Sequence, residues 1–505
     1  MVATKEIDHA TELDFMLTRM QDMVIDYIRK GQEEKTCVVN YHSPQELYKV
    51  IDLELPIVGS GVDGTFELIK STLAYSVNSW NPRFMDKLYA GTNPIGVISE
   101  LLLAVLNSNA HVYQVSPVLT LMEIEVTKAV GQLFGMGEKA GGLLCPGGSA
   151  SNLLAMVTAR NKLFPSIKSE GYFPRPYNVQ ASYGKLVVFT SEHSHYSIDK
   201  AAQVMGLGTD SIVKVPVDDI GRMKVDELER LISISIENDK TPFFINATAG
   251  TTVLGAFDPI REISAVAKKY QCWLHVDGSW GGTAIFSDKV NAETNWFDGS
   301  HLADTFTLNP HKLLGVPLQC SMLITPHDGH LLFAKTNSLK ADYLFHGNPY
   351  DLGAGTIGCG RRPDAAKVFL AWKFYGQKGL GSRVDKALTC AAEFTEIVRN
   401  RSRFKLVCDP SPFLQVCFWY VPECVVVDEK EYNVVMSEVT RELHRRVNQS
   451  GEFLVDHAPL KGVPDFFRIV VNAPTVSLHR DLERLLDAIE EASVGVDWNL
   501  LLSDV

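Results

Sequence analysis

The sequence predicts an α/β protein, with a large domain built on a mainly parallel sheet covered by helices and a smaller α+β domain after it. Strand-like and helix-like segments alternate through the middle of the chain, as is typical of parallel sheets with helical crossovers. Polar residues follow four of the predicted strands, where functional groups gather in such sheets. At 505 residues the chain is also too long for one small core, so two or three domains are expected.

The composition argues against several classes of function. The chain is 46% hydrophobic and 21% charged, as globular proteins commonly are, and its net charge of -12 disfavours a nucleic-acid or anionic-membrane surface. The nine cysteines form no CxxC pair and several lie in apolar runs, so we expect reduced thiols rather than a zinc site or a disulfide framework. A polar amino terminus and apolar stretches too short to span a membrane make the cytoplasm the expected location.

The amino-terminal part, residues 1–90, is expected to form a helical segment. Its clearest amphipathic run is "LDFMLTRMQDMVIDYIRK", which begins at Leu13. A segment of this size cannot bury a large core alone, so we expect it to pack on the rest of the chain or on a second subunit. The large domain is expected over residues 91–372 and the small domain over residues 373–505.

The large domain should contain six strands separated mostly by helices. The strands are predicted at residues 185–191, 211–217, 242–248, 272–277, 304–308 and 319–325. Helical patterns lie between most of them, at residues 197–206, 224–238 and 259–270. The carboxyl ends of four strands offer Thr190-Ser191, Thr248, Asp277 and the run Asn309 to Lys312 to one edge of the sheet.

The carboxyl-terminal third begins with a glycine-rich segment, residues 345–364, which lacks periodicity and is predicted to be a loop that can move. A helix near "AAKVFLAWKFYG", further helices, and strands around "LQVCFWYV" and "FFRIVVN" then indicate the small α+β domain.

Lys312 and Asp277 are the first candidate site. A lone lysine at a strand end most often reaches water. Here an aspartate also ends a neighbouring strand, in "WLHVD", and a buried aspartate needs a cation or a hydrogen-bond donor. A lysine and an aspartate so placed suit pyridoxal phosphate (PLP), because the lysine forms the imine and the acid keeps the pyridine nitrogen protonated.

The stretch "CPGGSASNLL", which begins at Cys145, is a candidate phosphate site. Two glycines and two serines lead into a helix, whose first N–H groups and dipole favour an anion. A glycine-serine turn that only caps a helix has the same appearance. The chain has neither a GxxxxGK[ST] loop nor a GxGxxG fingerprint, so ATP and dinucleotide binding lose support.

The stretch "SEHSHYS" places His193 and His195 just after a strand. As metal ligands they would need a third ligand that no recognisable spacing supplies, so no metal is expected. His195 fits better as an aromatic plate over a cofactor ring or as an acid/base, while His193 can equally be structural.

These motifs together resemble the group II PLP-dependent amino-acid decarboxylases, in particular the branch containing glutamate decarboxylase and cysteine sulfinate decarboxylase. They are "PGGSASN", "FTSEHSHYSIDKAA", "NATAGTTVLGAFDPI", "HVDGSWGG", "NPHK" and "FFRIVVN", in the family's order, and the likeness runs from near residue 81 to near residue 470. The resemblance implies the aspartate-aminotransferase fold (fold type I) and a homodimer with active sites at the interface, where the amino-terminal helices would serve dimerisation.

The resemblance also implies roles for individual residues. Lys312 would hold PLP covalently, Asp277 would pair with the pyridine nitrogen, and His195 would stack on the ring. The remaining cofactor-binding positions would be Ser149, Ala150, Ser151, Asn309 and His311 for the phosphate, Thr248 beside Asp277, and Ser279 against the second face of the ring.

Three further residues match substrate-binding positions of the family. Arg468 in "DFFRIVV" corresponds to the arginine that grips a substrate carboxylate, although an arginine on an edge strand can also be a surface residue. Lys87 replaces a glutamine that helps to bind the distal acid, and it could do the same or pair with Asp86 and leave the pocket. Tyr89 is aromatic as in the cysteine sulfinate branch, and a bulky ring should shorten the pocket. We therefore expect decarboxylation of aspartate or cysteine sulfinate ahead of glutamate.

Three departures from the family, the loop, Lys87 and Ser279, keep other functions open. The loop between "YLFH" and "CGRR" is short, and Tyr350 is its only candidate for the proton donor to Cα. Together with Lys87 and Ser279, the short loop leaves room for decarboxylation-coupled deamination or carbon–carbon bond formation. A catalytically silent PLP-binding or dimerising partner is a third possibility, against which the Lys312, Asp277 and His195 set is complete.

Overall fold

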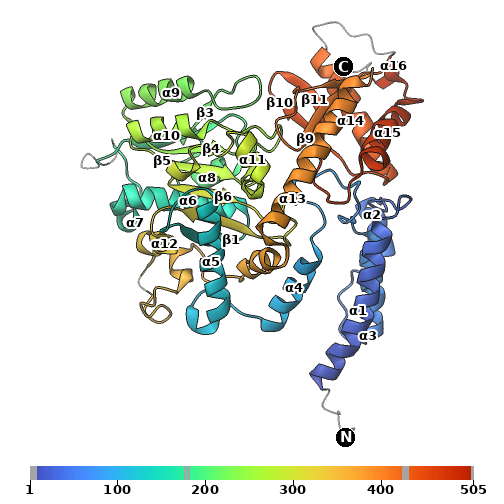
Figure 1. Ribbon diagram of the computed structural model, residues 1–505, viewed down its shortest axis with the longest axis horizontal. Coiled ribbons are helices and arrows are strands. Elements are labelled where there is room, and N and C mark those ends of the chain that lie inside the picture. Colours follow the sequence, from blue (N-terminus) through green and yellow to red (C-terminus); the bar gives the residue numbers. More distant parts are fainter. Residues whose placement is uncertain (1–7, 176–177, 179–181, 340, 424–431, 502–505) are drawn as a thin grey trace. The chain divides into compact units, whose positions relative to one another are not determined.

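The computed structural model describes residues 8–175, 178, 182–339, 341–423 and 432–501 (Figure 1). Cys424 lies outside these ranges; the other eight cysteines are free thiols, six of them buried. The chain forms two compact units, each described by itself below. The first comprises residues Met1–Gly91, Ala392–Val407 and Val416–Val505, and the second comprises Thr92–Ala391 and Cys408–Gln415. The division at residues 90 and 372 stays a prediction.

The second unit is built on a seven-stranded sheet, and the predicted mainly parallel sheet is confirmed. Its strand order is β1-β7-β6-β5-β4-β2-β3, and only β7 runs antiparallel to its neighbours. The strands are β1 (Gly141–Cys145), β2 (Lys185–Ser191), β3 (Ile212–Val215), β4 (Lys240–Thr248), β5 (Trp273–Gly278), β6 (Thr305–Leu308) and β7 (Ser321–Thr325).

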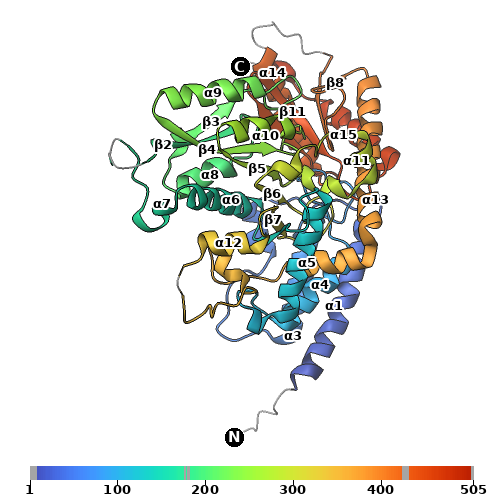
Figure 2. The same cartoon turned by 60° about the vertical axis from the view of Figure 1, so that its left-hand side comes forward.

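Helices bury the apolar runs that make these strands. The α-helices of this unit are α4 (Pro94–Leu106), α5 (Pro117–Leu133), α6 (Gly148–Leu163), α7 (Pro165–Glu170), α8 (Ser197–Val204), α9 (Val225–Glu237), α10 (Ile260–Lys269), α11 (Asp288–Glu293), α12 (His330–Asn337) and most of α13 (Ala365–Asn400). One core cluster joins α6, α8 and α12 to the sheet, through side chains such as Leu154, Ile198 and Phe333 packed with Val188 and Phe244. Helices α6 and α8 lie side by side (Figure 2).

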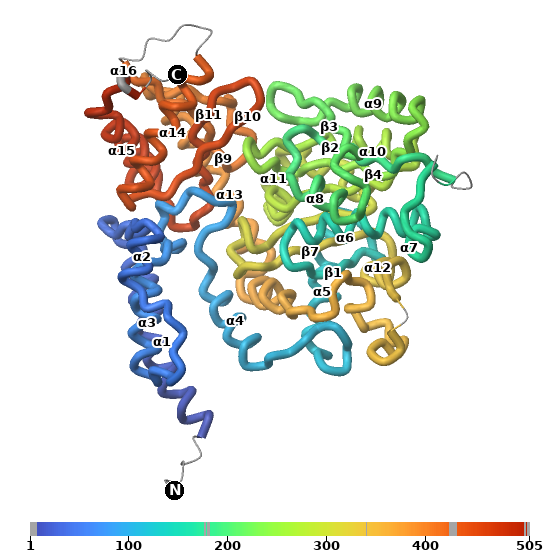
Figure 3. The backbone as a smooth tube through the Cα atoms, turned by 180° about the vertical axis from the view of Figure 1, so that it is seen from behind, coloured from blue at the N-terminus to red at the C-terminus, as the bar shows by residue number. Residues whose placement is uncertain are grey.

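The first unit contains an antiparallel four-stranded sheet of order β10-β11-β9-β8. Its elements are α1 (His9–Gly31), α2 (Pro44–Val50), α3 (Gly61–Tyr75), β8 (Phe404–Leu406), β9 (Gln415–Tyr420), α14 (Tyr432–Ser450), β10 (Asp456–Leu460), β11 (Val463–Val470), α15 (Arg484–Ser493) and α16 (Trp498–Leu501). Helix α1 begins where Asp8 accepts the N–H groups of Ala10 and Thr11, and it lies beside α3 (Figures 1 and 3).

Helix α13 is interrupted at Gly376, whose φ of 66° is one that residues with a side chain rarely adopt. Within the described part of the chain, none of the helices combines the length and the apolar character that crossing a membrane requires.

Candidate active site

The carboxyl ends of the central strands open into a cavity of about 250 Å³. Strands β4, β5 and β6 are neighbours, and Thr248 lies opposite Asp277 in their register. Eight residues predicted from the sequence line the cavity: Ser149, His195, Thr248, Asp277, Ser279, Asn309, His311 and Lys312. The second unit therefore brings together groups that are more than 160 positions apart in the chain.

Asp277 is buried at the wall of this cavity and has two hydrogen-bond donors. The Ser279 N–H donates to its Oδ1 over 3.0 Å, and Asn152 Nδ2 donates to its Oδ2 over 2.8 Å. Burial disfavours the charged form and the hydrogen bonds from Ser279 favour it, and the pKa of Asp277 lies below its ordinary value. Asp277 is therefore a carboxylate that can accept a hydrogen bond from a protonated pyridine nitrogen.

Lys312 lies in the tight turn that follows β6. Its backbone N–H donates to the Asn309 carbonyl over 3.0 Å, and its half-buried side chain lines the cavity. Beside it, Nδ1 of His311 lies 2.6 Å from the Cys320 carbonyl oxygen and donates its proton to it. Burial lowers the pKa of His311 to about 4, so this imidazole is neutral near pH 7.

His195 presents a neutral ring to the same cavity. The Ser197 N–H donates to Nδ1 over 3.2 Å, which leaves the ring proton on Nε2. Burial is also the main cause that lowers the pKa of His195. His193 does not line the cavity.

The start of α6 forms one end of the cavity, and any side chain at Gly148 would displace the cavity residues Ser279 and Asn309. A Cβ on Gly148 would lie 2.5 Å from Oγ of Ser279 and 2.9 Å from Nδ2 of Asn309. Oδ1 of Asn309 and Oγ1 of Thr248 are buried without a hydrogen-bond partner among the described residues. Such orphaned groups fit a cavity that binds a polar ligand such as PLP.

Two of the three predicted phosphate ligands at this helix do not reach the cavity by their side chains. Ser149 lines it, whereas Ser151 is buried with its Oγ 2.7 Å from Oγ of Ser321. Ala150 instead faces a separate cavity of about 290 Å³, beside Leu153 and Thr356. Successive side chains on a helix point about 100° apart, so three in a row cannot face one ligand.

The predicted proton donor, Tyr350, is not among the residues that line the cavity. It is 43% exposed, and its ring centroid lies 5.5 Å from that of Tyr113. Five lining residues were not singled out from the sequence: Gly148, Tyr196, Gly250, Thr252 and Trp280. All lie within or beside the motifs already recognised, so neighbouring positions of each motif were the available signal.

The three predicted substrate-binding residues lie in the first unit. Arg468 on β11 is ion-paired with Asp456, and its Nη2 also donates to the Asp86 carbonyl over 3.0 Å. Lys87 Nζ lies 2.9 Å from Oδ1 of Asp86 and 3.3 Å from Oδ2 of Asp456. Burial opposes the charge of Lys87, but these two acids outweigh it and raise its pKa. The ring of Tyr89 packs 5.5 Å from that of Phe84.

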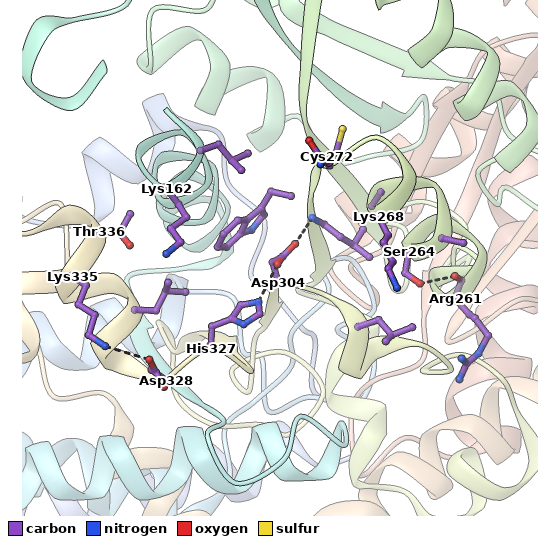
Figure 4. Close-up of a pocket in the computed structure, with 18 residues that line it drawn as sticks. Lys162, Arg261, Ser264, Lys268, Cys272, Asp304, His327, Asp328, Lys335 and Thr336 are labelled. Carbon is purple, nitrogen blue, oxygen red and sulfur yellow. Dashed lines mark hydrogen bonds and ion pairs between the residues drawn. The ribbon is translucent and has the colours of Figure 1, made fainter. Parts of the chain in front are cut away.

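A larger cavity, of about 890 Å³, lies beside the starts of β5 and β6 (Figure 4). Its two acids are already paired, Asp304 with His327 over 3.0 Å and Asp328 with Lys335 over 3.2 Å. It contains none of the predicted PLP-binding residues. Size alone therefore does not identify the active site.

A model of the pyridoxal-dependent decarboxylase conserved domain matches residues 44–421. The chain belongs to this family: it is a PLP-dependent decarboxylase, and the predicted fold, cofactor and class of enzyme are confirmed.

Its relatives are similar over nearly their whole lengths. The L-aspartate decarboxylase dtxS4 of Metarhizium robertsii is 40% identical over 497 residues, which cover 94% of this chain and 95% of the relative. The cysteine sulfinic acid decarboxylase of Rattus norvegicus is 36% identical over 93% of both chains. A crystal structure of mouse CSAD superposes with a TM-score of 0.90 at 34% identity, covering 97% of this chain and 100% of that chain.

Proposed function

We propose that this enzyme removes the α-carboxylate of a short acidic L-amino acid, aspartate or cysteine sulfinate ahead of glutamate, and releases CO2 and the corresponding amine. The observation that carries the proposal is the near full-length similarity to two decarboxylases named for aspartate and for cysteine sulfinic acid. The cationic groups Arg468 and Lys87 support an acidic substrate, and the bulk of Tyr89 supports a short one.

The roles of the cavity residues follow from their chemistry. Bound PLP supplies an electron-accepting ring that stabilises negative charge at the substrate Cα. The ionised Asp277 would hold a proton on the ring nitrogen, and the neutral His195 would stack on the ring without adding charge. Lys312 would bind the cofactor covalently and carry protons through its amine. Asn309, Thr248 and Ser149 would donate hydrogen bonds to the cofactor's oxygens.

Arg468 would bind the substrate's acidic group. Its guanidinium can give two parallel hydrogen bonds to a carboxylate or sulfinate. In the structure the Arg468 guanidinium forms an ion pair with Asp456, and Asp456 also pairs with Lys87. The sequence did not predict a role for Asp456. A substrate acid would compete with Asp456, so we propose that this aspartate keeps the pocket selective for strongly charged groups.

We also propose that the enzyme is a homodimer with active sites at the subunit interface, and that it is located in the cytoplasm. Apolar side chains on α4 support an interface, because Ile98, Leu102 and Val105 are exposed in the single chain.

The test is a CO2-release and amine-product assay on PLP-loaded enzyme, with aspartate, cysteine sulfinate, glutamate and an aromatic amino acid run side by side. We expect one short acidic substrate to be turned over at least tenfold faster than glutamate. In Tyr89→Ala the preference should shift toward glutamate, while Tyr89→Phe, which keeps the ring, should leave it unchanged. Faster turnover of glutamate by the wild-type enzyme would contradict the proposal.

One observation favours a second candidate, decarboxylation-coupled deamination, since Tyr350 does not line the cavity. Turnover in D2O separates the two reactions. A single deuteron at Cα of an intact amine supports plain decarboxylation. An aldehyde with released ammonia, formed with consumption of O2 as the two-electron oxidant and release of H2O2, supports the second candidate.

A further inference from the structure

A line of buried hydrogen bonds leads from Asp277 into the sheet. Asn152, which donates to Asp277, has its Oδ1 3.0 Å from Nε2 of His275. Nδ1 of His275 lies 3.0 Å from Oγ1 of Thr305, and Trp273 Nε1 donates to that hydroxyl over 3.0 Å. All five residues are at most 5% exposed, and only Asp277 lines the 250 Å³ cavity.

The local structure explains why these side chains meet. Alternate residues of a strand share a face, so Trp273, His275 and Asp277 all project from the same side of β5. Thr305 lies opposite His275 in the parallel register with β6. Asn152 comes from α6, which packs against these strands.

The carboxylate end of the line fixes the direction of its hydrogen bonds. The Trp273 indole can only donate, and the Asp277 carboxylate can only accept. Because the Asn152 amide donates to Asp277, its Oδ1 faces Nε2 of His275, so the imidazole proton is on Nε2. Nδ1 of His275 then accepts from the Thr305 hydroxyl, which accepts from the indole.

The other protonation states of His275 are disfavoured. With the proton on Nδ1 alone, the Nε2 lone pair would face Oδ1 of Asn152, and flipping the amide would turn that oxygen toward the Asp277 carboxylate. An imidazolium would satisfy both neighbours, but burial lowers the pKa of His275 to about 4, so this form is absent near pH 7.

We propose that Asn152, His275 and Thr305 are positioning residues that hold Asp277 in one orientation, as a carboxylate, for the pyridine nitrogen of PLP. This inference rests on the proposed role of Asp277. Asn152, the last residue of the line, donates to Oδ2 of Asp277. Oδ1 of Asp277 accepts the Ser279 N–H and keeps a second lone pair for the pyridine ring. The line begins at Trp273, which lines the larger cavity, so it runs along one face of the sheet from one cavity to the other.

The test compares two substitutions of Thr305, which does not line the cofactor cavity. Thr305→Val removes the hydroxyl at nearly constant volume, and Thr305→Ser keeps it. The dissociation constant of PLP for the apoenzyme is measured from the visible absorbance of lysine-bound cofactor. We expect a rise of about tenfold for Thr305→Val and a change of less than about twofold for Thr305→Ser, since an unsatisfied buried group costs more than a lost methyl. Thr127→Val, which removes a buried hydroxyl bonded only to carbonyls of its own helix, should bind PLP normally.

A second measurement does not depend on a variant. In protein labelled with 15N-histidine, nitrogen–proton couplings should place the His275 proton on Nε2, and a proton on Nδ1 would overturn the inference. So would equal PLP affinities for Thr305→Val and Thr305→Ser.

Asp277→Asn separates this inference from the proposed function. If Asp277→Asn binds PLP as the wild type does, the proposed role of Asp277 is wrong. If that variant loses affinity while Thr305→Val retains it, the role of Asp277 stands and the positioning line is wrong.

Discussion

At the scale of single residues, burial sets the protonation states around the cofactor cavity. His195, His275 and His311 all have pKa values below that of a free imidazole, in each case mainly because they are buried. Near neutral pH these rings therefore contribute hydrogen bonds and aromatic faces. Asp277, whose pKa is lowered, would therefore supply the negative charge that orients the cofactor.

These pKa values predict how stability depends on pH. His275 and His311 take up a proton in the unfolded chain near pH 6.5 but in the folded protein only near pH 4. At these two groups the unfolded state thus binds more protons between these values, so their contribution to the free energy of unfolding of the apoenzyme should fall as the pH drops from 6.5 to 4. Each group should contribute on the order of 1–3 kcal/mol.

Urea unfolding of the apoenzyme at a series of pH values checks this dependence. His275→Gln removes one titrating ring, so its stability should fall less steeply over the same pH window. An identical slope in wild type and His275→Gln would show that His275 has the same pKa in the folded protein as in the unfolded chain, and would contradict the prediction.

At the scale of elements, the turn between β1 and α6 shapes the cofactor site. Gly147 has a φ of 91° and caps α6, and Gly148 follows it against Ser279 and Asn309. The free N–H groups of the first turn give this end of the helix a partial positive charge, which favours the cofactor's phosphate.

Gly148→Ala tests this packing. The added methyl group would overlap Oγ of Ser279 and Nδ2 of Asn309, so we expect the dissociation constant of PLP to rise by about tenfold or more. The matched control is Gly358→Ala, because a Cβ there meets no atom within 4 Å and its φ is not in the left-handed region. Normal PLP binding by Gly148→Ala, measured by equilibrium titration, would contradict the close approach.

At the scale of the whole molecule, the sequence predicted the parts of the fold that have local signals. Strand β2 occupies the predicted residues, and the polar groups after β4, β5 and β6 meet as expected. Strand β1 was missed because it begins with two glycines, which are rare in strands. Gly142 is required there, since a Cβ would lie 2.1 Å from the Leu323 carbonyl oxygen.

Long-range pairing was beyond the reach of a single sequence. Nothing local indicates that Asp456 bridges Lys87 and Arg468, which are 381 positions apart in the chain. Likewise, the motif "PGGSASN" marks a phosphate-binding helix, but only helical geometry shows that Ser149 faces the cavity while Ser151 faces β7.

The central claim is that the carboxyl ends of β4, β5 and β6 form the PLP site, with Lys312 as the residue that binds the cofactor. Borohydride reduction of the PLP-loaded enzyme fixes the cofactor on its lysine, and peptide mass spectrometry then identifies that lysine, with Lys312→Ala as the control. We predict one modified peptide, carrying phosphopyridoxyl-Lys312, in the wild type and none in Lys312→Ala. Modification of a different lysine, or equal labelling of the Lys312→Ala protein, would contradict the account.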